Sequence, residues 1–236
     1  MRIRLYAIPY AGGTSRAFDV IRPYLSEKYD LFSIELAGKG NRAREGNYEH
    51  YQEAVDDVVE IICKDSYEGP IALFGYSMGS LLAFDAVRIL ETLYHKKIEF
   101  LVVAANIAPS LPQKEFRLWE YDEKSFLDKL IEIEGMPEQI LRNKRFLDIY
   151  LKVLKEDYYL IGERKSKLDT TQVAAPILAL GGTEDELYNS VDGWKKHTRS
   201  LFCYQMIEGK HFFIKNNPML VAEQINKMGV EINDES

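Results

Sequence analysis

Short apolar segments alternate with longer amphipathic segments along most of the chain. The segments with the length and composition of buried strands are Ile3–Ile8, Leu31–Glu35, Ile71–Phe74, Phe100–Ala104, Ile177–Leu180 and Leu201–Ile207. Tyr51–Cys63 repeats apolar residues at helical spacing, and Phe213–Met228 is expected to form a closing helix before a frayed acidic tail, Val230–Ser236. This alternation predicts an α/β fold, with a mostly parallel, doubly wound sheet that carries helices on both faces.

The alternation stops between about residues 109 and 173, where charged amphipathic segments replace strands. The helices expected there are Ser125–Glu134, Glu138–Arg142 and Arg145–Tyr159, with Gly135-Met136-Pro137 as a break. An insertion of this kind usually covers strand ends as a lid, and the alternative is a plain structural layer of helices. Because no repeat or linker is present, we expect one domain, residues 1–236, with a helical lid at about 109–173.

Two glycines flank a serine at the point where a predicted strand meets a predicted helix. The apolar run Pro70–Phe74 precedes Gly75-Tyr76-Ser77-Met78-Gly79, and Ser80–Leu90 follows with an apolar helical stripe. Strand, Gly-x-Ser-x-Gly and helix together form the context of a nucleophile elbow. The pentapeptide alone is a common accident that also suits an ordinary glycine turn. Its context favours Ser77 as a nucleophile.

Composition narrows the class of protein. A chain of 236 residues with 46% hydrophobic residues fits a single α/β domain with a sizeable core. The net charge of −7 argues against nucleic-acid binding, and no apolar run approaches the ~18 residues that span a membrane. The beginning of the chain does not have the pattern of a secretory signal. Cys63 and Cys203 indicate neither a disulfide framework nor a metal site, so we expect both thiols to be buried. A cytoplasmic enzyme is the simplest expectation from these features.

A nucleophilic serine needs a base, and a carboxylate must orient that base. In this class of fold the chain order is serine, acid, histidine, each at the carboxyl end of a strand. Of the four histidines, His211 is the last and follows the predicted strand Leu201–Ile207, so we expect it to be the base. His50, His95 and His197 are expected at the surface.

The acid is expected in the loop after the preceding strand, Ala175–Leu180. That loop contains Glu184, Asp185 and Glu186, and spacing alone does not choose among them. Solvated acids are also common in such turns. Position favours Asp185 over Glu184.

The oxyanion of acyl transfer needs two preorganised N–H donors. The residue after the nucleophile, Met78, is expected to supply one through its backbone. The loop Tyr10-Ala11-Gly12-Gly13 is expected to supply the other, because its glycines allow the backbone to approach a ligand closely. Ala11 is the preferred donor and Gly12 the alternative. The glycines would also suit a simple strand-to-helix turn, but the match with Ser77 favours an oxyanion loop.

These motifs together resemble a known family, the stand-alone (type II) thioesterases of non-ribosomal peptide and polyketide synthesis, in the α/β-hydrolase superfamily. Three segments are similar to its Pro-x-Ala-Gly-Gly opening, its Leu-Pro-Gly-Arg-Gly-x-Arg segment and its Gly-His-Ser-Met-Gly elbow: Pro9–Gly13, Leu36–Arg42 and Gly75–Gly79. Three more resemble its block from acid to histidine: Gly182–Asp185, Gly193–Lys196 and Gly209–Phe213. The similarity covers nearly the whole chain. Alignment of the last block places the triad acid on Asp185.

The sequence departs from the family pattern at two places. Tyr76 replaces the usual histidine of the elbow, and Ala37-Gly38-Lys39 replaces Pro-Gly-Arg. Neither departure falls on a triad position. We expect Tyr76 to change the packing beside the serine.

The resemblance implies a serine hydrolase that cleaves thioesters, with Ser77, Asp185 and His211 as catalytic residues and Met78 and Ala11 as oxyanion donors. The implied substrate is an aberrant or stalled acyl group on the phosphopantetheine arm of a carrier protein, with no metal or bound cofactor. Carrier-protein domains of a synthetase are the implied partners, nucleic acid and membrane are not, and a monomer is expected. The alternatives are a carboxylesterase for small free esters and a non-catalytic acyl-binding or docking scaffold, since a fold carries no substrate identity.

Overall fold

The computed structural model describes residues 1–111, 118–132, 142–164, 169–185 and 190–234. Within these residues, a six-stranded sheet has the order β2-β1-β3-β4-β5-β6, and all neighbouring strands are parallel. The strands are β1 (Ile3–Ile8), β2 (Tyr29–Ser33), β3 (Ile71–Tyr76), β4 (Ile98–Ala104), β5 (Ile177–Gly182) and β6 (Phe202–Ile207). The predicted α/β class with a parallel sheet is confirmed.

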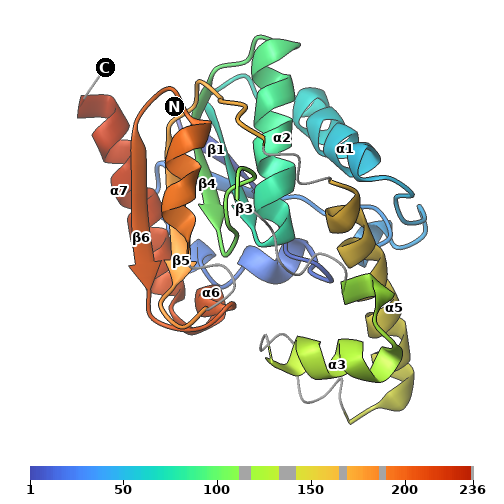
Figure 1. Cartoon of the computed structure of the whole chain (residues 1–236). Helices are drawn as coiled ribbons and strands as arrows, with labels where there is room; N and C mark the ends of the chain where they lie inside the picture. Colours follow the sequence, from blue (N-terminus) through green and yellow to red (C-terminus); the bar gives the residue numbers. More distant parts are fainter. Residues whose placement is uncertain (112–117, 133–141, 165–168, 186–189, 235–236) are drawn as a thin grey trace.

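Helices cover both faces of the sheet (Figure 1). One face carries α1 (Tyr51–Lys64) and α2 (Met78–Thr92), and the other carries α7 (Pro218–Asp234), which the short α6 (Phe213–Asn216) precedes. Short 3-10 helices occupy several connections: η1 (Ser15–Phe18), η2 (Arg22–Tyr24), η3 (Gly40–Arg42) and η5 (Val191–His197). The arrangement is doubly wound, as the alternation of strands and helices predicts.

Alternating side chains divide the core into two layers. Along β1, Tyr6 and Ile8 pack with α1 and α2, whereas Leu5 and Ala7 pack with the layer under α7. Successive residues of a strand point to opposite faces, so a strand covered on both sides must be apolar at every position. This explains why the inner strands β3 and β5 have no charged side chain, whereas the edge strands β2 and β6 carry partly or fully exposed polar residues such as Asp30 and Gln205.

Two boundaries differ from the prediction. The closing helix predicted as Phe213–Met228 is divided, because Pro218 has no backbone N–H to continue α6 and instead begins α7. Helix α7 then continues to Asp234, so the tail predicted to fray is helical as far as that residue.

Strand β2 is Tyr29–Ser33 rather than the predicted Leu31–Glu35. Glu35 lies beyond the strand, where its carboxylate accepts hydrogen bonds from the backbone and hydroxyl of Ser15. The two cysteines lie on α1 and β6 as expected, but both are partly exposed rather than buried.

Between β4 and β5 the described residues form helices and no strand. These are η4 (Leu118–Glu120), α3 (Glu123–Glu132) and α5 (Lys144–Glu163), which we call the helical insertion. They lie beyond the carboxyl ends of the strands, on the same side as α6 (Figure 1). The predicted break at residues 135–137 and the predicted helix at 138–142, except Arg142, lie outside the described residues. No helix in the described ranges is both long and apolar enough to cross a membrane.

Candidate active site

Ser77 occupies a strained turn between β3 and α2. Its φ of 53° and ψ of −117° place it in a region that non-glycine residues rarely adopt. A Cβ atom on Gly75 would lie 2.1 Å from the carbonyl oxygen of Gly79, and one on Gly79 would lie 2.0 Å from that of Ile8. Only glycine fits at either flank, so the sequence pattern of the elbow has a direct steric cause.

Hydrogen bonds from the end of β4 hold this elbow in place. The Ser77 N–H donates to Ala104 O at 2.8 Å, and the side-chain amide of Asn106 donates to Ser77 O at 2.9 Å. Ser80 Oγ, fully buried, lies 2.9 Å from Gly75 O and accepts from the Ala104 N–H at 3.0 Å. The sequence analysis missed the supports from Asn106 and Ser80, which lack a local signal.

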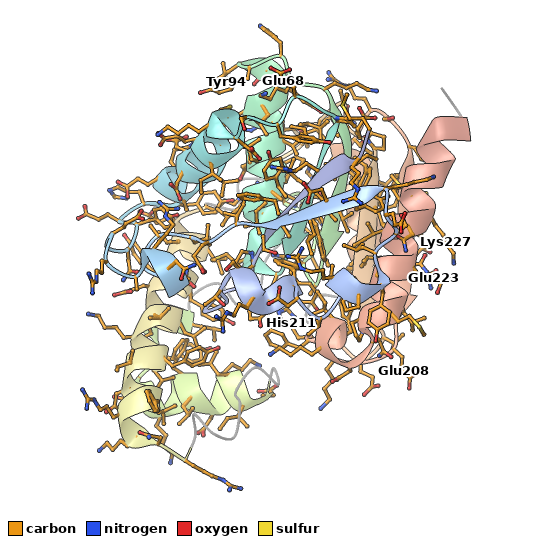
Figure 2. All side chains as sticks on the ribbon, turned by 180° about the vertical axis from the view of Figure 1, so that it is seen from behind. Glu68, Tyr94, Glu208, His211, Glu223 and Lys227 are labelled. Carbon is orange, nitrogen blue, oxygen red and sulfur yellow. The ribbon has the colours of Figure 1, made fainter. Side chains whose placement is uncertain are left out.

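The structure brings Ser77, Asp185 and His211 into one chain of hydrogen bonds. His211 Nδ1 lies 2.8 Å from Asp185 Oδ2, and His211 Nε2 lies 3.0 Å from Ser77 Oγ. Because a carboxylate only accepts, Nδ1–H donates to Asp185, and Nε2 is left to accept from the serine hydroxyl. Asp185 and His211 are each 5% exposed. Figure 2 shows His211 at the end of the sheet that faces the helical insertion.

The loops that carry the acid and the histidine are joined through their backbones. Thr183 N–H donates to Ile207 O at 2.9 Å, and Glu184 N–H donates to Gly209 O at 3.0 Å. A Cβ atom on Gly182 would lie 2.6 Å from Gly209 O, so this close approach requires glycine. Parallel pairing of β5 and β6 therefore places the acid beside the histidine.

Of the three candidate carboxylates, Asp185 is the one that reaches His211. The side chain of Glu184 is exposed. Its backbone N–H bonds Gly209 O in the loop that carries His211. Glu186 lies outside the described residues.

Tyr76 holds the backbone of His211 in place. Its buried hydroxyl donates to the carbonyl oxygen of His211 at 2.7 Å and accepts from the Ile214 N–H at 3.4 Å. Burial raises the pKa of the Tyr76 phenol well above its usual value, so the hydroxyl stays a donor. Its ring stacks on Phe212 and meets Tyr10 edge-on. The departure from the family's histidine thus adds a contact that fixes the loop of the predicted base.

The predicted oxyanion loop forms a tight turn next to the elbow. Gly13 N–H donates to Tyr10 O at 2.8 Å, and Gly12 has a φ of 70°, as the third position of a type II turn requires. Gly12 N–H donates to Asp157 Oδ2 of α5 at 2.6 Å. Because this bond already engages the Gly12 N–H, the geometry favours Ala11 as the oxyanion donor. Met78 is the first residue of α2, where a backbone N–H has no intrahelical acceptor.

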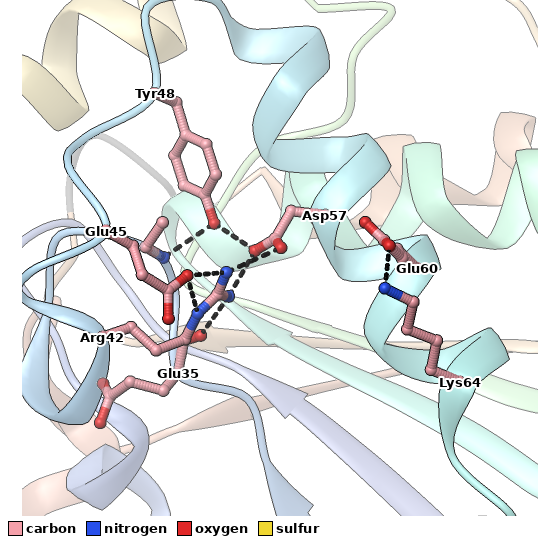
Figure 3. A network of polar contacts seen from close by, with 8 residues as sticks. Glu35, Arg42, Glu45, Tyr48, Asp57, Glu60 and Lys64 are labelled. Atoms are coloured by element: carbon pink, nitrogen blue, oxygen red, sulfur yellow. Dashed lines mark hydrogen bonds and ion pairs between the residues drawn. The ribbon is translucent and has the colours of Figure 1, made fainter.

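The segment Leu36–Arg42 is anchored to α1 by a polar network (Figure 3). Arg42 pairs with Glu45 and with Asp57 at 2.6 Å each, and these hydrogen bonds raise the pKa of its guanidinium. Tyr48 donates to Asp57 and accepts from the Ala37 N–H at 2.9 Å. Figure 3 also shows the Glu60–Lys64 pair, which lies apart from the network on α1. The network fixes the loop that carries Lys39.

Lys39 extends from this loop to the helical insertion. Its Nζ lies 2.6 Å from Asp157 Oδ1, and both side chains are 5% exposed. The sequence analysis missed Asp157, although a signal exists: an acid lies on the stripe of α5 whose other members are apolar. The buried apolar members are Leu151, Leu154, Leu160 and Ile161.

The remaining histidines lie away from the serine. His50, at the start of α1, and His95 are exposed as expected. The expectation for His197 was wrong, because its ring is fully buried against Phe84 and Trp194. The cause is the three-residue period of the 3-10 helix η5, which turns residues 191, 194 and 197 inwards while the neighbouring lysines face out.

The chain is similar to several known proteins over most of its length. The family model described as "Thioesterase domain" matches residues 3–228. Gramicidin S biosynthesis protein GrsT of Aneurinibacillus migulanus is 30% identical over 215 residues, or 90% of this chain and 83% of that protein. Thioesterase PikA5 of Streptomyces venezuelae is 29% identical over 216 residues, or 91% and 76%. The crystal structure of ClbQ from the colibactin NRPS/PKS pathway has a TM-score of 0.91 at 25% identity and covers 100% of both chains.

Proposed function

The chain belongs to the thioesterase family, and we propose that it hydrolyses aberrant or stalled acyl thioesters on the phosphopantetheine arm of carrier-protein domains. The family resemblance drawn from the sequence motifs is confirmed by the match over residues 3–228, and the protein is a serine hydrolase that acts on thioester bonds. Relatives named for peptide and polyketide pathways support the choice of a carrier-bound substrate.

The observation that carries the proposed mechanism is the hydrogen-bonded chain from Asp185 through His211 to Ser77. Ser77 Oγ attacks the thioester carbonyl while His211 Nε2 takes its proton, and Asp185 stabilises the imidazolium. The tetrahedral intermediate collapses, the C–S bond breaks, and His211 gives the proton to the departing thiolate, which leaves as the thiol. Water, deprotonated by His211, then attacks the acyl-serine ester and releases the carboxylic acid and Ser77. The reaction as proposed consumes only water and uses no metal or cofactor.

Met78 and Ala11 are the proposed oxyanion donors. The start of α2 supplies an N–H without an intrahelical acceptor and the positive end of a helix dipole. The tight turn at Tyr10–Gly13 supports Ala11 as the second donor, since the neighbouring N–H of Gly12 is bound to Asp157. Each such donor typically contributes ~10²–10³-fold to the rate.

We assign the helical insertion the role of a lid within a single domain, at about residues 109–173. Its own apolar cluster packs against Ala11 and Phe212, next to the elbow and the histidine. This position supports a role as a wall of the acyl pocket and as part of the face that meets the carrier protein. A cytoplasmic location and a monomeric state complete the proposal.

Hydrolysis of an acyl-loaded carrier protein, compared with small free esters, tests the substrate class. We expect a strong preference for the carrier-bound thioester, and Ser77→Ala to lower its kcat by at least about 10⁴-fold. A preference for free esters would identify a carboxylesterase instead.

A fluorophosphonate probe separates an enzyme from a binding protein. The probe is expected to label the wild type and not Ser77→Ala. An unlabelled wild type, or equal labelling of both, would support a non-catalytic scaffold.

A further inference from the structure

One buried carboxylate of the helical insertion holds two loops beside the elbow. Asp157, which is buried, accepts from the Gly12 N–H at 2.6 Å through Oδ2 and from Lys39 Nζ at 2.6 Å through Oδ1. The three residues come from α5, from the turn after β1 and from the segment before α1. A single side chain therefore connects the insertion to the turn that carries Ala11.

Stability alone is a poor explanation for this pair. A buried ion pair loses the hydration of both charges, and replacing it with apolar side chains is often neutral or stabilising. The geometry is specific, because each carboxylate oxygen meets one short charge-assisted hydrogen bond. Such an arrangement fixes the positions of its partners.

The turn also packs directly against the helix that carries Asp157. A Cβ atom on Gly12 would lie 2.7 Å from Leu154 and 3.2 Å from the ring of Tyr150. Burial raises the pKa of Tyr150 to about 12, so its phenol stays neutral in this contact. The backbone of Gly12 is thus held between α5 and the elbow, with Asp157 as its acceptor.

We propose that Asp157 is a positioning residue for the oxyanion hole. It fixes the Tyr10–Gly13 turn so that the Ala11 N–H points at the developing oxyanion, and Lys39 fixes the carboxylate. The inference rests on the proposed function, because it assigns Asp157 a role in the hydrolysis by Ser77. Displacement of the turn by about 1 Å can cost ~10²-fold in rate without contact with substrate.

A second buried ion pair on the same helical segment provides a matched control. Arg164, which follows α5, lies 2.6 Å from Asp85 of α2, and the side chains are 11% and 8% exposed. Asp85 also accepts from the hydroxyl of Tyr51 at 2.9 Å. This pair anchors the end of α5 that is distant from Asn143 and, among the described residues, makes no hydrogen bond to Ser77, His211 or the oxyanion turn.

The experiment compares two double variants, Lys39→Met with Asp157→Leu and Arg164→Met with Asp85→Leu. Both replace a buried ion pair with apolar side chains, so the melting temperature of each is expected to stay within a few degrees of the wild type. Only the first removes the acceptor of the Gly12 N–H. On an acyl-loaded carrier protein, its kcat is expected to fall about 10- to 100-fold with KM within about threefold, while the control keeps kcat within about twofold.

Each outcome decides between the alternatives. A kcat within threefold of the wild type in the first double variant overturns the proposal, and so does an equal loss in the control, which would indicate a general effect of α5 docking. If the first double variant does not fold, Lys39→Gln with Asp157→Ala, which also leaves no side-chain acceptor for the Gly12 N–H, is judged by the same criteria, with Arg164→Gln and Asp85→Ala as its control. Failure of the proposed function would instead appear in the wild type, as absence of Ser77-dependent thioester hydrolysis.

Discussion

Ser77, Asp185 and His211 lie on loops that the sheet positions directly, whereas α3 and α5 lie beyond the carboxyl ends of the strands, and α5 joins the main core near its end through Leu160 and Ile161. The triad loops continue from parallel strands and are joined by backbone hydrogen bonds. The helical insertion has a small apolar cluster of its own, consisting of Leu118, Phe126, Leu130, Leu151 and Leu154. Its helix α5 leaves Phe146 61% and Ile149 57% exposed.

Under the proposed mechanism, this difference separates the reacting groups from the helices that cover them. Groups that transfer protons must be held to a fraction of an ångström, and the large core beneath the strands would provide that rigidity for Ser77, His211 and Asp185. The insertion is tied to the sheet at particular points, through Asp157 on the oxyanion turn and through the buried His197. His197 bonds Thr171 O and Ser110, which lie near the two ends of the insertion.

Replacement of Asp185 tests the loops that the sheet positions directly, and its effect on kcat is expected to exceed that of the other variants. Asp185→Asn is expected to lower kcat about 10⁴-fold, because an amide cannot stabilise the imidazolium or hold the correct tautomer of His211. The matched control is the neighbouring exposed residue, and Glu184→Gln should keep kcat within about twofold. Steady-state hydrolysis of a carrier-bound thioester measures both. A larger loss from Glu184→Gln would reverse the assignment of the acid.

A pair of core truncations compares how firmly the two regions are held. Phe100 in β4 and Phe126 in α3 are both fully buried. Phe100→Ala is expected to lower the free energy of unfolding by about 3–5 kcal/mol. Phe126→Ala is expected to cost less in global unfolding and to speed amide exchange mainly in α3 and α5, because a small cluster opens locally. Equal losses in urea titrations would show that the insertion and the sheet unfold as one unit.

Removal of the Tyr76 hydroxyl tests how far the position of His211 depends on a single buried hydrogen bond. Tyr76→Phe leaves the buried carbonyl of His211 without its donor, at a cost of about 1–3 kcal/mol in stability, and is expected to lower kcat several-fold. Tyr29→Phe is the control, since that hydroxyl donates to Ile225 O at 2.8 Å on the opposite face of the sheet from α1 and α2. It should lose similar stability with kcat unchanged. Unchanged kcat in Tyr76→Phe would contradict a role in placing the base.

The pH dependence of stability tests His197, which connects the helical insertion to the sheet, and this effect is expected to be the weakest. Burial lowers the pKa of His197 from its ordinary 6.5, against smaller opposing contributions from the Thr171 carbonyl and Asp169, while Arg164 and Lys196 lower it further. Just below pH 6.5 the unfolded chain therefore binds more protons at this residue than the folded one, and stability falls as the pH falls.

His197→Gln should flatten this dependence between about pH 5 and 7, by at most one proton. Leu93→Gln, which changes an exposed residue without a titratable group, should keep the slope of the wild type. Urea unfolding at a series of pH values measures all three proteins. A slope for His197→Gln equal to that of the wild type would disprove the buried neutral imidazole.

Much of the fold could be predicted because its causes are local. Continuous apolar runs indicate strands covered on both faces, and the elbow has glycines where a Cβ atom would collide with backbone. Errors arose where the cause was not local. His197 lies among lysines in the sequence, and only the 3-10 helix turns its ring inwards. Asp157 lies on a helix with many charged residues. Its partners, Gly12 and Lys39, are distant in the chain, so no local pattern indicates that it is buried and hydrogen-bonded.

Spacing, glycine sterics and strand order are properties of the chain, so the amino-acid sequence is enough to assign the class of fold, the turn at Ser77 and the order of serine, acid and histidine. The folded structure adds the contacts themselves: Asp185, which the sequence favoured, reaches His211, the Gly12 N–H is already engaged by Asp157, and the Tyr76 hydroxyl bonds the backbone of His211. Those outcomes depend on which segments meet across the ends of parallel strands. Packing brings such segments together at distances of 2.6–3.0 Å, and no local pattern encodes those contacts.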